Sequence, residues 1–240
     1  MSTYSTNDLS ALLRANAYPG RGIVIGKTPD GKNAVAAYFI MGRSENSSNR
    51  IFVEQDGAVF TRAFDESKVQ DPSLIIYAAV RTVGNRLVVT NGDQTDTICD
   101  ALSSGGCFTS ALKTRKFEPD APNFTPRISG MLTFRQNNFT YKMSILKSAD
   151  AAGTACNRFT YDYAPVNGLG HFLHTYDCDG NPIPTFTGEP ERVAMENDID
   201  LFTENLWDSL NEANKISLYV RYTELAGGGV KTRLINKNHE

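Results

Sequence analysis

Two arginines, Arg43 and Arg50, stand near the ends of a short polar segment that is rich in serine and asparagine. The apolar runs on either side, 35–41 and 51–53, are short and rich in aromatic and branched residues, which is typical of buried strands. A guanidinium can hold phosphate or carboxylate through two parallel hydrogen bonds. The segment is therefore either an anion-binding loop at the rim of a sheet or a solvated loop whose arginines pair with surface carboxylates.

A second candidate anion site is the polar turn 91–97, which follows a strand predicted at 86–90 and precedes a short helix predicted at 98–102. A strand, an Asn-Gly turn and a helix can direct backbone N–H groups at an anion. Asp93 and Asp96 are equally compatible with capping of that helix, because Asp commonly caps helices. Capping and ligand binding both stay open at this turn.

The cysteines and histidines form no recognisable metal motif. None of the four cysteines is paired at C-x-x-C spacing, which disfavours a zinc site and fits reduced thiols in the cytosol. His171 and His174 would share one face of a helix, but Gly168 and Gly170 disfavour a helix there. We therefore expect no metal site at these residues.

The overall composition is that of an ordinary soluble protein. The chain has 240 residues, a formal charge of −3 and 40% hydrophobic residues, so neither nucleic acid nor an anionic membrane is an expected partner. No apolar run could span a bilayer, and the N-terminus lacks the features of a signal peptide. We expect a cytoplasmic protein. The oligomeric state stays undetermined, and a homo-oligomer is compatible with the sequence.

Hairpins dominate the predicted secondary structure. Amphipathic helices are predicted at 6–15 and 198–213, and the apolar segment 74–81 suits either a strand or a helix. Further predicted strands are 22–28, 33–41, 50–54, 58–63, 128–134, 139–146, 158–164, 171–177 and a closing strand at 216–225. Without a repeat or a linker, the chain is predicted to be one α+β domain, 1–240.

Several short motifs, taken in their order along the chain, resemble those of a known protein family. They are Tyr18-Pro19-Gly20-Arg21-Gly22, Arg43-Ser44, Ser48-Asn49-Arg50, Ile76-Tyr77, Val83-Gly84, Asn91-Gly92, Thr95-Asp96-Thr97, Phe117-Glu118 and Thr125-Pro126-Arg127-Ile128. Together they resemble the stand-alone IMP cyclohydrolases, which are not fused to a formyltransferase. The resemblance covers roughly 18–130, so 1–17 look like an N-terminal extension. It implies a four-layer αββα sandwich with mostly antiparallel sheets, like the N-terminal-nucleophile hydrolases but without their self-processed nucleophile.

The same resemblance implies a reaction and a set of site residues. The family closes the ring of 5-formamidoimidazole-4-carboxamide ribotide, with loss of water, to give inosine monophosphate. By matching position, Arg50, Tyr77 and Glu118 would be catalytic. The substrate would be bound by Arg21, Arg43, Ser44, Asn49, Asn91, Gly92, Thr95, Asp96 and Arg127. No metal or redox cofactor is implied.

These side chains suit that reaction. A carboxamide nitrogen is a poor nucleophile until it loses a proton, and Glu118, if desolvated between Phe117 and Pro119, could accept the proton or hold the amide in line. The formyl oxygen gains negative charge as the ring closes, and Arg50 or the Tyr77 hydroxyl could stabilise it. Because the attack is intramolecular, holding the substrate in its reactive rotamer supplies much of the acceleration.

Each of these residues is also compatible with a purely structural role. Glu118 could be a surface carboxylate, and Tyr77 could be a core residue with a satisfied hydroxyl. Arg127 could pair with Glu118 or Asp120. Two further functions also fit the sequence: a purine-nucleotide-binding module without catalysis, and an amide hydrolase of the same fold, which would need a Cys, Ser or Thr exposed at a processed N-terminus.

Overall fold

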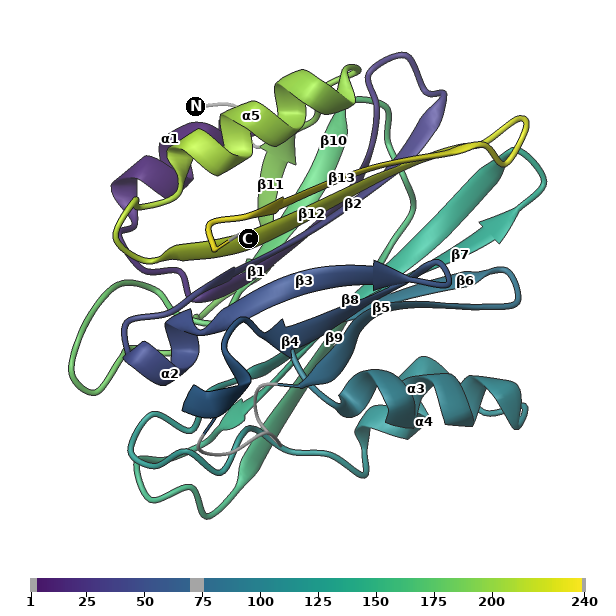
Figure 1. The fold of residues 1–240 in the computed structure, drawn as a ribbon. Coiled ribbons are helices and arrows are strands. Elements are labelled where there is room, and N and C mark those ends of the chain that lie inside the picture. Colours follow the sequence, from purple (N-terminus) through teal and green to yellow (C-terminus); the bar gives the residue numbers. More distant parts are fainter. Residues whose placement is uncertain (1–3, 70–75, 239–240) are drawn as a thin grey trace.

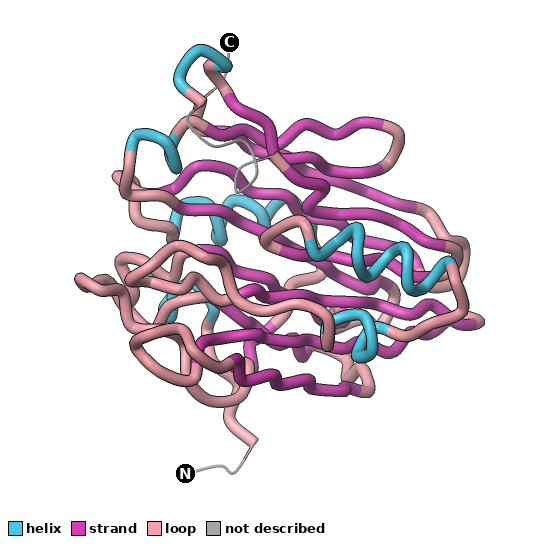
Figure 2. The backbone as a smooth tube through the Cα atoms, turned by 90° about the horizontal axis from the view of Figure 1, so that it is seen from below, coloured by secondary structure: helices cyan, strands magenta, loops and turns pink. Residues whose placement is uncertain are grey.

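The computed structural model describes residues 4–69 and 76–238, which form two antiparallel sheets packed face to face with helices on both outer faces (Figure 1). Helices α1 (Leu9–Ala15) and α5 (Ile199–Ser209) cover the six-stranded sheet. Helices α3 (Gln94–Ser103) and α4 (Phe108–Leu112) cover the seven-stranded sheet on the opposite side (Figure 2). This arrangement confirms the predicted four-layer α+β sandwich.

The six-stranded sheet combines strands from both ends of the chain. Its order is β11-β10-β1-β2-β12-β13, with every neighbouring pair antiparallel. The strands are β1 (Arg21–Lys27), β2 (Asn33–Met41), β10 (Leu169–His174), β11 (Glu191–Ala194), β12 (Lys215–Glu224) and β13 (Val230–Asn236). The N-terminal hairpin β1–β2 is therefore flanked on both sides by strands from the C-terminal part of the chain.

The seven-stranded sheet follows the order of the chain, β3-β4-β5-β6-β7-β8-β9, again with antiparallel neighbours. Its strands are β3 (Arg50–Gln55), β4 (Ala58–Ala63), β5 (Tyr77–Val83), β6 (Arg86–Thr90), β7 (Arg127–Arg135), β8 (Asn138–Ser148) and β9 (Cys156–Tyr163). Two short helical segments complete the structure, α2 (Glu45–Ser48) and the 3-10 turn η1 (Glu66–Lys68).

Burial on both faces explains why the central strands β1 and β2 of the six-stranded sheet are apolar at almost every interior position. In β1, Ile23 and Ile25 belong to the core between the sheets, whereas Val24 packs under the helices with Leu13 and Phe202. Successive strand residues point to opposite faces, so a strand covered on both sides needs apolar residues at odd and even positions alike. The continuous run at 35–41 in β2 has the same cause.

The two helices over the six-stranded sheet have aspartate caps. Asp198 accepts hydrogen bonds from the backbone N–H groups of Asp200 and Leu201 at 2.7 and 3.1 Å, and Asp8 does the same for the start of α1. Helix α1 packs against α5, so part of the segment predicted to be an extension belongs to the helical layer. Helix α5 ends at Ser209, four residues before the predicted end.

The structure corrects several predicted elements. The ambiguous segment 74–81 forms strand β5 from Tyr77 onward, and 74–75 lie outside the described residues. Helix α3 begins at Gln94 rather than at 98. The strand predicted at 171–177 is β10, which starts earlier and ends at His174. Helix α4 and strands β11 and β13 were not predicted, so β12 is not the closing strand.

The polar segment between Arg43 and Arg50 is not a plain loop, because it contains helix α2. The side chains of Ser44 and Ser47 each bond to the other's backbone N–H, which forms a capping box. His171 and His174 lie three residues apart on a strand, as the neighbouring glycines indicated, so they point to opposite faces and cannot share a metal there. None of the helices within 4–69 and 76–238 has the length and apolar composition that a transmembrane span requires.

One pair of glycines on β1 and β10 leaves room for the Met195 side chain against the sheet, and it gives a stability prediction. Gly26 faces Gly170 in the sheet, and a Cβ at Gly26 would lie 2.6 Å from the Gly170 Cα and 2.8 Å from the Met195 sulfur. We expect Gly26→Ala to lower the free energy of unfolding by about 1–3 kcal/mol, because backbone atoms cannot move aside. Urea unfolding measures this change. The matched control is Gly227→Ala, whose Cβ would meet only the flexible Glu224 side chain, and we expect a change within about 0.5 kcal/mol.

Candidate active site

The candidate site lies at one end of the sandwich, where several strands begin. Its residues include the first residues of β1, β3, β5 and β7, which are Arg21, Arg50, Tyr77 and Arg127. Strands β3, β5 and β7 alternate with antiparallel neighbours. They therefore run in the same direction and start at the same end of the sheet. Strand β2 ends beside the start of β1, and the short α2 connection brings the chain from there directly to Arg50.

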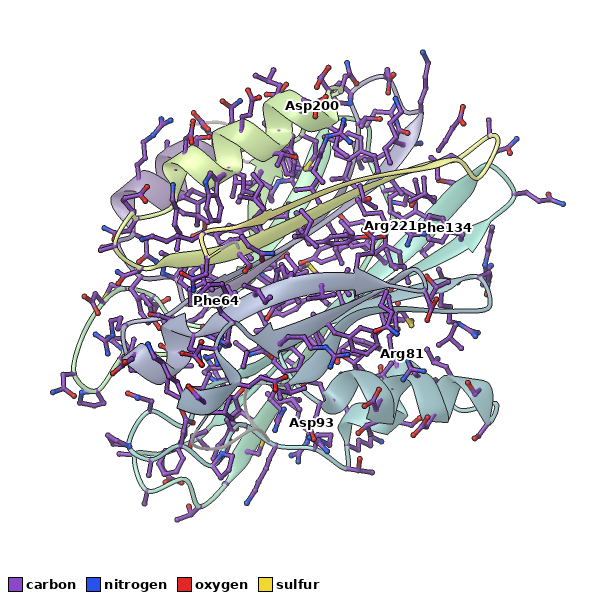
Figure 3. The ribbon with its side chains drawn as sticks, in the orientation of Figure 1. Phe64, Arg81, Asp93, Phe134, Asp200 and Arg221 are labelled. Carbon is purple, nitrogen blue, oxygen red and sulfur yellow. The ribbon has the colours of Figure 1, made fainter. Side chains whose placement is uncertain are left out.

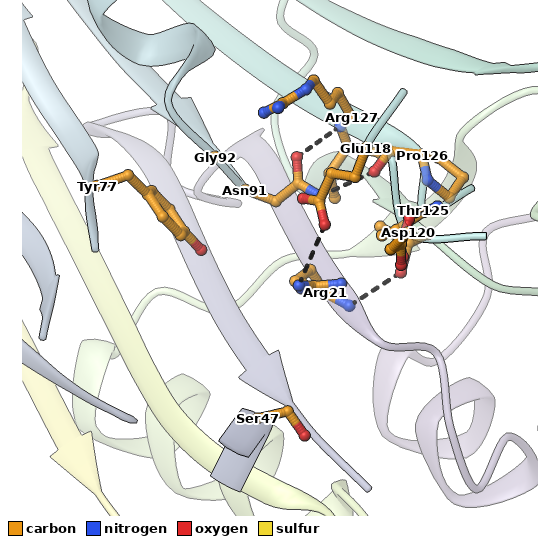
Figure 4. Close-up of polar contacts among 12 residues, drawn as sticks. Arg21, Ser47, Tyr77, Asn91, Gly92, Glu118, Asp120, Thr125, Pro126 and Arg127 are labelled. Carbon is orange, nitrogen blue, oxygen red and sulfur yellow. Dashed lines mark hydrogen bonds and ion pairs between the residues drawn. The ribbon is translucent and has the colours of Figure 1, made fainter. Parts of the chain in front are cut away.

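Arg21 and Glu118 form a buried ion pair (Figure 4). The Arg21 Nη2 atom lies 3.7 Å from Glu118 Oε2, and the two side chains are 12% and 4% exposed. Glu118 precedes β7 in a loop, where its backbone N–H donates to the Thr125 carbonyl at 2.9 Å. Burial raises the pKa of the Glu118 carboxyl, and the positive charge of Arg21 opposes this shift without cancelling it. The possibility that Glu118 is a surface carboxylate is therefore wrong.

Arg50 is also buried, but it has no anionic partner of its own. Its Nε donates to the Ser47 carbonyl at 2.6 Å and its Nη2 to the Met41 carbonyl at 3.3 Å. Within the part of the chain that the structure describes, no carboxylate forms an ion pair with Arg50. Burial lowers the pKa of Arg50, and the nearby charge of Arg21 lowers it further. The site thus contains two buried guanidiniums and one buried carboxylate, an excess of positive charge.

Tyr77 extends the same cluster toward the core. Its hydroxyl contacts the Tyr38 hydroxyl at 2.8 Å, and both side chains are buried. Burial raises the pKa of Tyr38 well above its ordinary value. Tyr77 interacts electrostatically with both Arg21 and Arg50, and Arg50 interacts with Glu118. The structure therefore brings the three predicted catalytic residues together around Arg21.

The side chain of Asn91 ties the Asn91–Gly92 turn to the start of β7. Asn91 donates from Nδ2 to the Pro126 carbonyl at 2.8 Å and accepts from the Ile128 N–H at 2.9 Å. These bonds fix the start of β7, which directly follows the loop that carries Glu118. Asn91 therefore positions the neighbouring segment by using its amide within the protein.

Arg127 also lies against the Asn91–Gly92 turn, and it forms an ion pair that the sequence analysis did not predict. A Cβ at Gly92 would lie 2.4 Å from Arg127 Nη1, so glycine makes room for this guanidinium. Arg127 donates to Gln94 Oε1 and pairs with Asp93 Oδ1, both at 2.7 Å. Asp93 occupies the N-cap position of α3 but makes no capping hydrogen bond, because its carboxylate binds arginines instead. The expected pairing of Arg127 with Glu118 or Asp120 is not formed.

Two further predicted residues of α3 lie away from the cluster. Thr95 is buried with its hydroxyl 2.6 Å from that of Thr90, and Asp96 pairs with Arg81 at 2.6 Å. Arg81 and Asp93 mark this region on the helix side of the seven-stranded sheet (Figure 3). Arg21, by contrast, lies on the same face of β1 as Ile23, which faces the core between the sheets. The structure does not bring Thr95 or Asp96 to the Arg21–Glu118 pair.

The remaining predicted binding residues are engaged within the protein. Arg43 forms an ion pair with Asp179 and lies over the Tyr18 ring, 5.0 Å from its centroid. Ser44 caps α2. Asn49 exchanges two hydrogen bonds with the backbone of Asp65, both at 2.8 Å. Of these three, only Arg43 has a charged group that a ligand could recruit.

Sequence reasoning missed a second group of residues beside the ion pair. Tyr176 stacks on Tyr18 with ring centroids 5.8 Å apart, and its hydroxyl lies 2.5 Å from that of Thr125. Asp120 accepts from the Thr125 N–H at 2.7 Å. Thr125 belongs to one of the recognised motifs, and this motif was the signal in the sequence that could have indicated the group. Tyr176 follows β10, in a region where no motif was recognised.

The segment from residue 18 to residue 228 matches the family model described as IMP cyclohydrolase-like protein. The chain belongs to this family. The match extends well beyond the region 18–130 in which the motifs of the IMP cyclohydrolases were recognised, and it includes Tyr176. Both sheets therefore contain segments that the family shares.

Individual relatives named IMP cyclohydrolase support the same family assignment. The Methanopyrus kandleri protein is 37% identical over 116 residues, an alignment that covers 47% of this chain and 57% of the relative. The Methanococcus aeolicus protein is 30% identical over 166 residues, covering 67% of this chain and 75% of the relative. A Methanococcus maripaludis protein is 35% identical over 121 residues, covering 48% and 58%. The matched part of the chain thus spans little more than half the length of two of these three relatives.

The raised pKa of Glu118 predicts how stability depends on pH. A carboxyl whose folded-state pKa exceeds its unfolded value destabilises the fold increasingly as pH rises through the folded-state pKa. We therefore expect the difference in melting temperature between Glu118→Gln and the wild type to shift in favour of the variant as the pH rises from about 4.3, the ordinary glutamate pKa, to about 7.5. Thermal unfolding at several pH values measures this. The control is Glu204→Gln on the exposed face of α5, which should change the melting temperature little throughout. A difference between Glu118→Gln and the wild type that did not depend on pH would contradict the assignment.

Proposed function

We propose that this protein is an IMP cyclohydrolase, which closes the ring of 5-formamidoimidazole-4-carboxamide ribotide, with loss of water, to give inosine monophosphate. The observation that carries the proposal is the buried assembly of Arg21, Arg50, Tyr77 and Glu118 at one end of the sandwich. Membership of the IMP cyclohydrolase-like family supports it, as do the names of the relatives.

The charge of the site suits a phosphorylated substrate. Arg21 and Arg50 supply two positive charges against the single charge of Glu118. In addition, the Nε atom of Arg21 is buried and has no hydrogen-bond partner among the described residues. Buried donors are rarely left unpaired, so a bound anion or carbonyl oxygen would complete the site. Arg43 and Arg127 would supply further positive charge around it.

Glu118 is the proposed acceptor of the amide proton. The carboxamide nitrogen attacks the formyl carbon, a C–N bond forms, and the nitrogen passes one proton to the carboxylate. A general base works best when its pKa lies near the working pH, and burial moves the pKa of Glu118 upward in that direction. Glu118 returns its proton to the formyl oxygen, which becomes a hydroxyl. The hydroxyl leaves as water with the proton that the formamido nitrogen gives up as the new C=N bond forms.

Arg50 and Tyr77 are the proposed donors to the formyl oxygen as negative charge develops on it. Two backbone carbonyls fix the guanidinium of Arg50, and Tyr38 fixes the hydroxyl of Tyr77. Donors that are already held in place need no reorganisation during the reaction, which is the main source of electrostatic stabilisation in enzymes. Both groups also orient the substrate for an intramolecular attack.

A cyclisation assay tests the proposal. We expect the purified protein to convert the formylated ribotide to inosine monophosphate, at a rate that a metal chelator does not change. Glu118→Gln and Arg50→Met should each lower kcat by about 10²–10³-fold, because each removes one group that acts on the reacting atoms. Chromatography of the product measures the rate, and circular dichroism checks the fold. The matched control is Arg62→Ala, an exposed arginine on β4, which should retain wild-type kcat.

Two outcomes would contradict different parts of the proposal. Wild-type turnover in both site variants would remove the assignment of Arg50 and Glu118 while leaving the activity in place. Binding of inosine monophosphate by the wild-type protein without any turnover would instead favour a nucleotide-binding module.

A further inference from the structure

One contact between side-chain hydroxyls joins the two sheets beside the candidate site. Tyr176 follows β10 of the six-stranded sheet, whereas Thr125 precedes β7 of the seven-stranded sheet. The Tyr176 Oη atom lies 2.5 Å from Thr125 Oγ1, and the two residues are 2% and 1% exposed. A hydrogen bond this short, between groups this well buried, holds the two segments at a defined separation.

Thr125 in turn holds the loop that carries Glu118. Its carbonyl accepts the Glu118 N–H at 2.9 Å, and its own N–H donates to Asp120 Oδ1 at 2.7 Å. Its hydroxyl also bonds to the second carboxylate oxygen of Asp120. An ionised carboxylate can only accept, so Thr125 Oγ1 donates to Asp120 and accepts from Tyr176. The order of donors along this chain of three residues is therefore fixed.

Tyr176 is itself held against the segment that carries Arg21. Its backbone N–H donates to the Pro19 carbonyl at 3.2 Å, and its ring stacks on Tyr18. Gly20 has a φ of +78°, and a Cβ there would lie 2.5 Å from the Tyr176 ring. Tyr176 therefore contacts the residues just before Arg21 and, through its hydroxyl, the loop of Glu118.

We propose that Tyr176 is a positioning residue, whose hydroxyl fixes the loop of Glu118 relative to Arg21 and so places the carboxylate where the amide loses its proton. This inference rests on the proposed cyclohydrolase function. Tyr176 acts through Thr125 and Glu118 and does not itself contact the reacting atoms. Small displacements of a catalytic group lower the rate strongly while leaving substrate binding by the other residues intact.

Steady-state kinetics of substitutions in the full-length protein test the inference. We expect Tyr176→Phe to lower kcat about tenfold, with KM changed less than about twofold, because only the placement of Glu118 is lost. Thr125→Val should lower kcat at least as much, because it removes the bond to Tyr176 and also the bond to Asp120. Thr125→Ser, which keeps the hydroxyl, should retain wild-type kcat. The double variant Tyr176→Phe with Thr125→Val should be no slower than Thr125→Val alone, because Thr125→Val already removes the contact with Tyr176.

A second comparison separates positioning of Glu118 from a general structural effect. In the Glu118→Gln background, Tyr176→Phe should cause no further loss of kcat, because the group that it positions is already absent. A loss that arose from partial unfolding would lower kcat equally in both backgrounds. The matched control is Tyr222→Phe, which removes the hydroxyl of another buried tyrosine, one that donates to the Glu196 carbonyl at 2.9 Å. It should retain wild-type kcat.

The outcomes distinguish this inference from the function on which it rests. If the wild-type protein forms inosine monophosphate and Tyr176→Phe keeps wild-type kcat, the positioning role is wrong and the function stands. Independent, multiplicative losses from Tyr176→Phe and Glu118→Gln would also overturn the positioning role. If the wild-type protein shows no cyclisation, both fail. Should Tyr176→Phe not fold, the comparison of Thr125→Ser with Thr125→Val carries the test, because valine replaces the hydroxyl by a methyl group of similar size.

Discussion

The burial of two guanidiniums beside one carboxylate is the constraint on which this end of the molecule depends. A charge taken out of water costs several kcal/mol unless other groups compensate it. The negative charge of Glu118 compensates the charge of Arg21. Among the described residues, the guanidinium of Arg50 donates its hydrogen bonds to backbone carbonyls, those of Ser47 and Met41. Each of these groups comes from a separate segment, so the segments must be held in register by the surrounding sheets. The site and the fold around it therefore stabilise each other.

The topology of the sheets supplies that register. In an antiparallel sheet every second strand starts at the same edge, so residues far apart in sequence gather without long connections. Arg50 and Tyr77 reach the site in this way, at the starts of β3 and β5. Arg21 belongs to the other sheet and reaches the site because the inner faces of the two sheets pack against each other. Catalytic groups placed at strand ends are held rigidly while still reaching the rim.

The hairpins, the amphipathic helices and the α+β class could be predicted because periodicity and turn residues are local signals. The proximity of Arg50, Tyr77 and Glu118, the proposed catalytic residues, could be anticipated only through the order of motifs, since Tyr77 and Arg50 look like core and loop residues by themselves. Two contributions depended on tertiary contacts that no local pattern encodes. Asp93 binds arginines instead of capping α3, and Tyr176 meets Thr125 from a distant strand. These contacts are set by tertiary packing, and the one between Tyr176 and Thr125 is set by packing between the two sheets.

The position of β1 and β2 between β10 and β12 has a consequence for biogenesis. The hairpin β1–β2 emerges from the ribosome before its partners in the sheet, which are synthesised only after the whole seven-stranded sheet. Pairings this distant along the chain form late, because closing long loops is entropically costly. The nascent chain therefore exposes the edges of β1 and β2 until β10 and β12 have been synthesised, and chaperones that bind extended apolar segments can act on this hairpin throughout that interval.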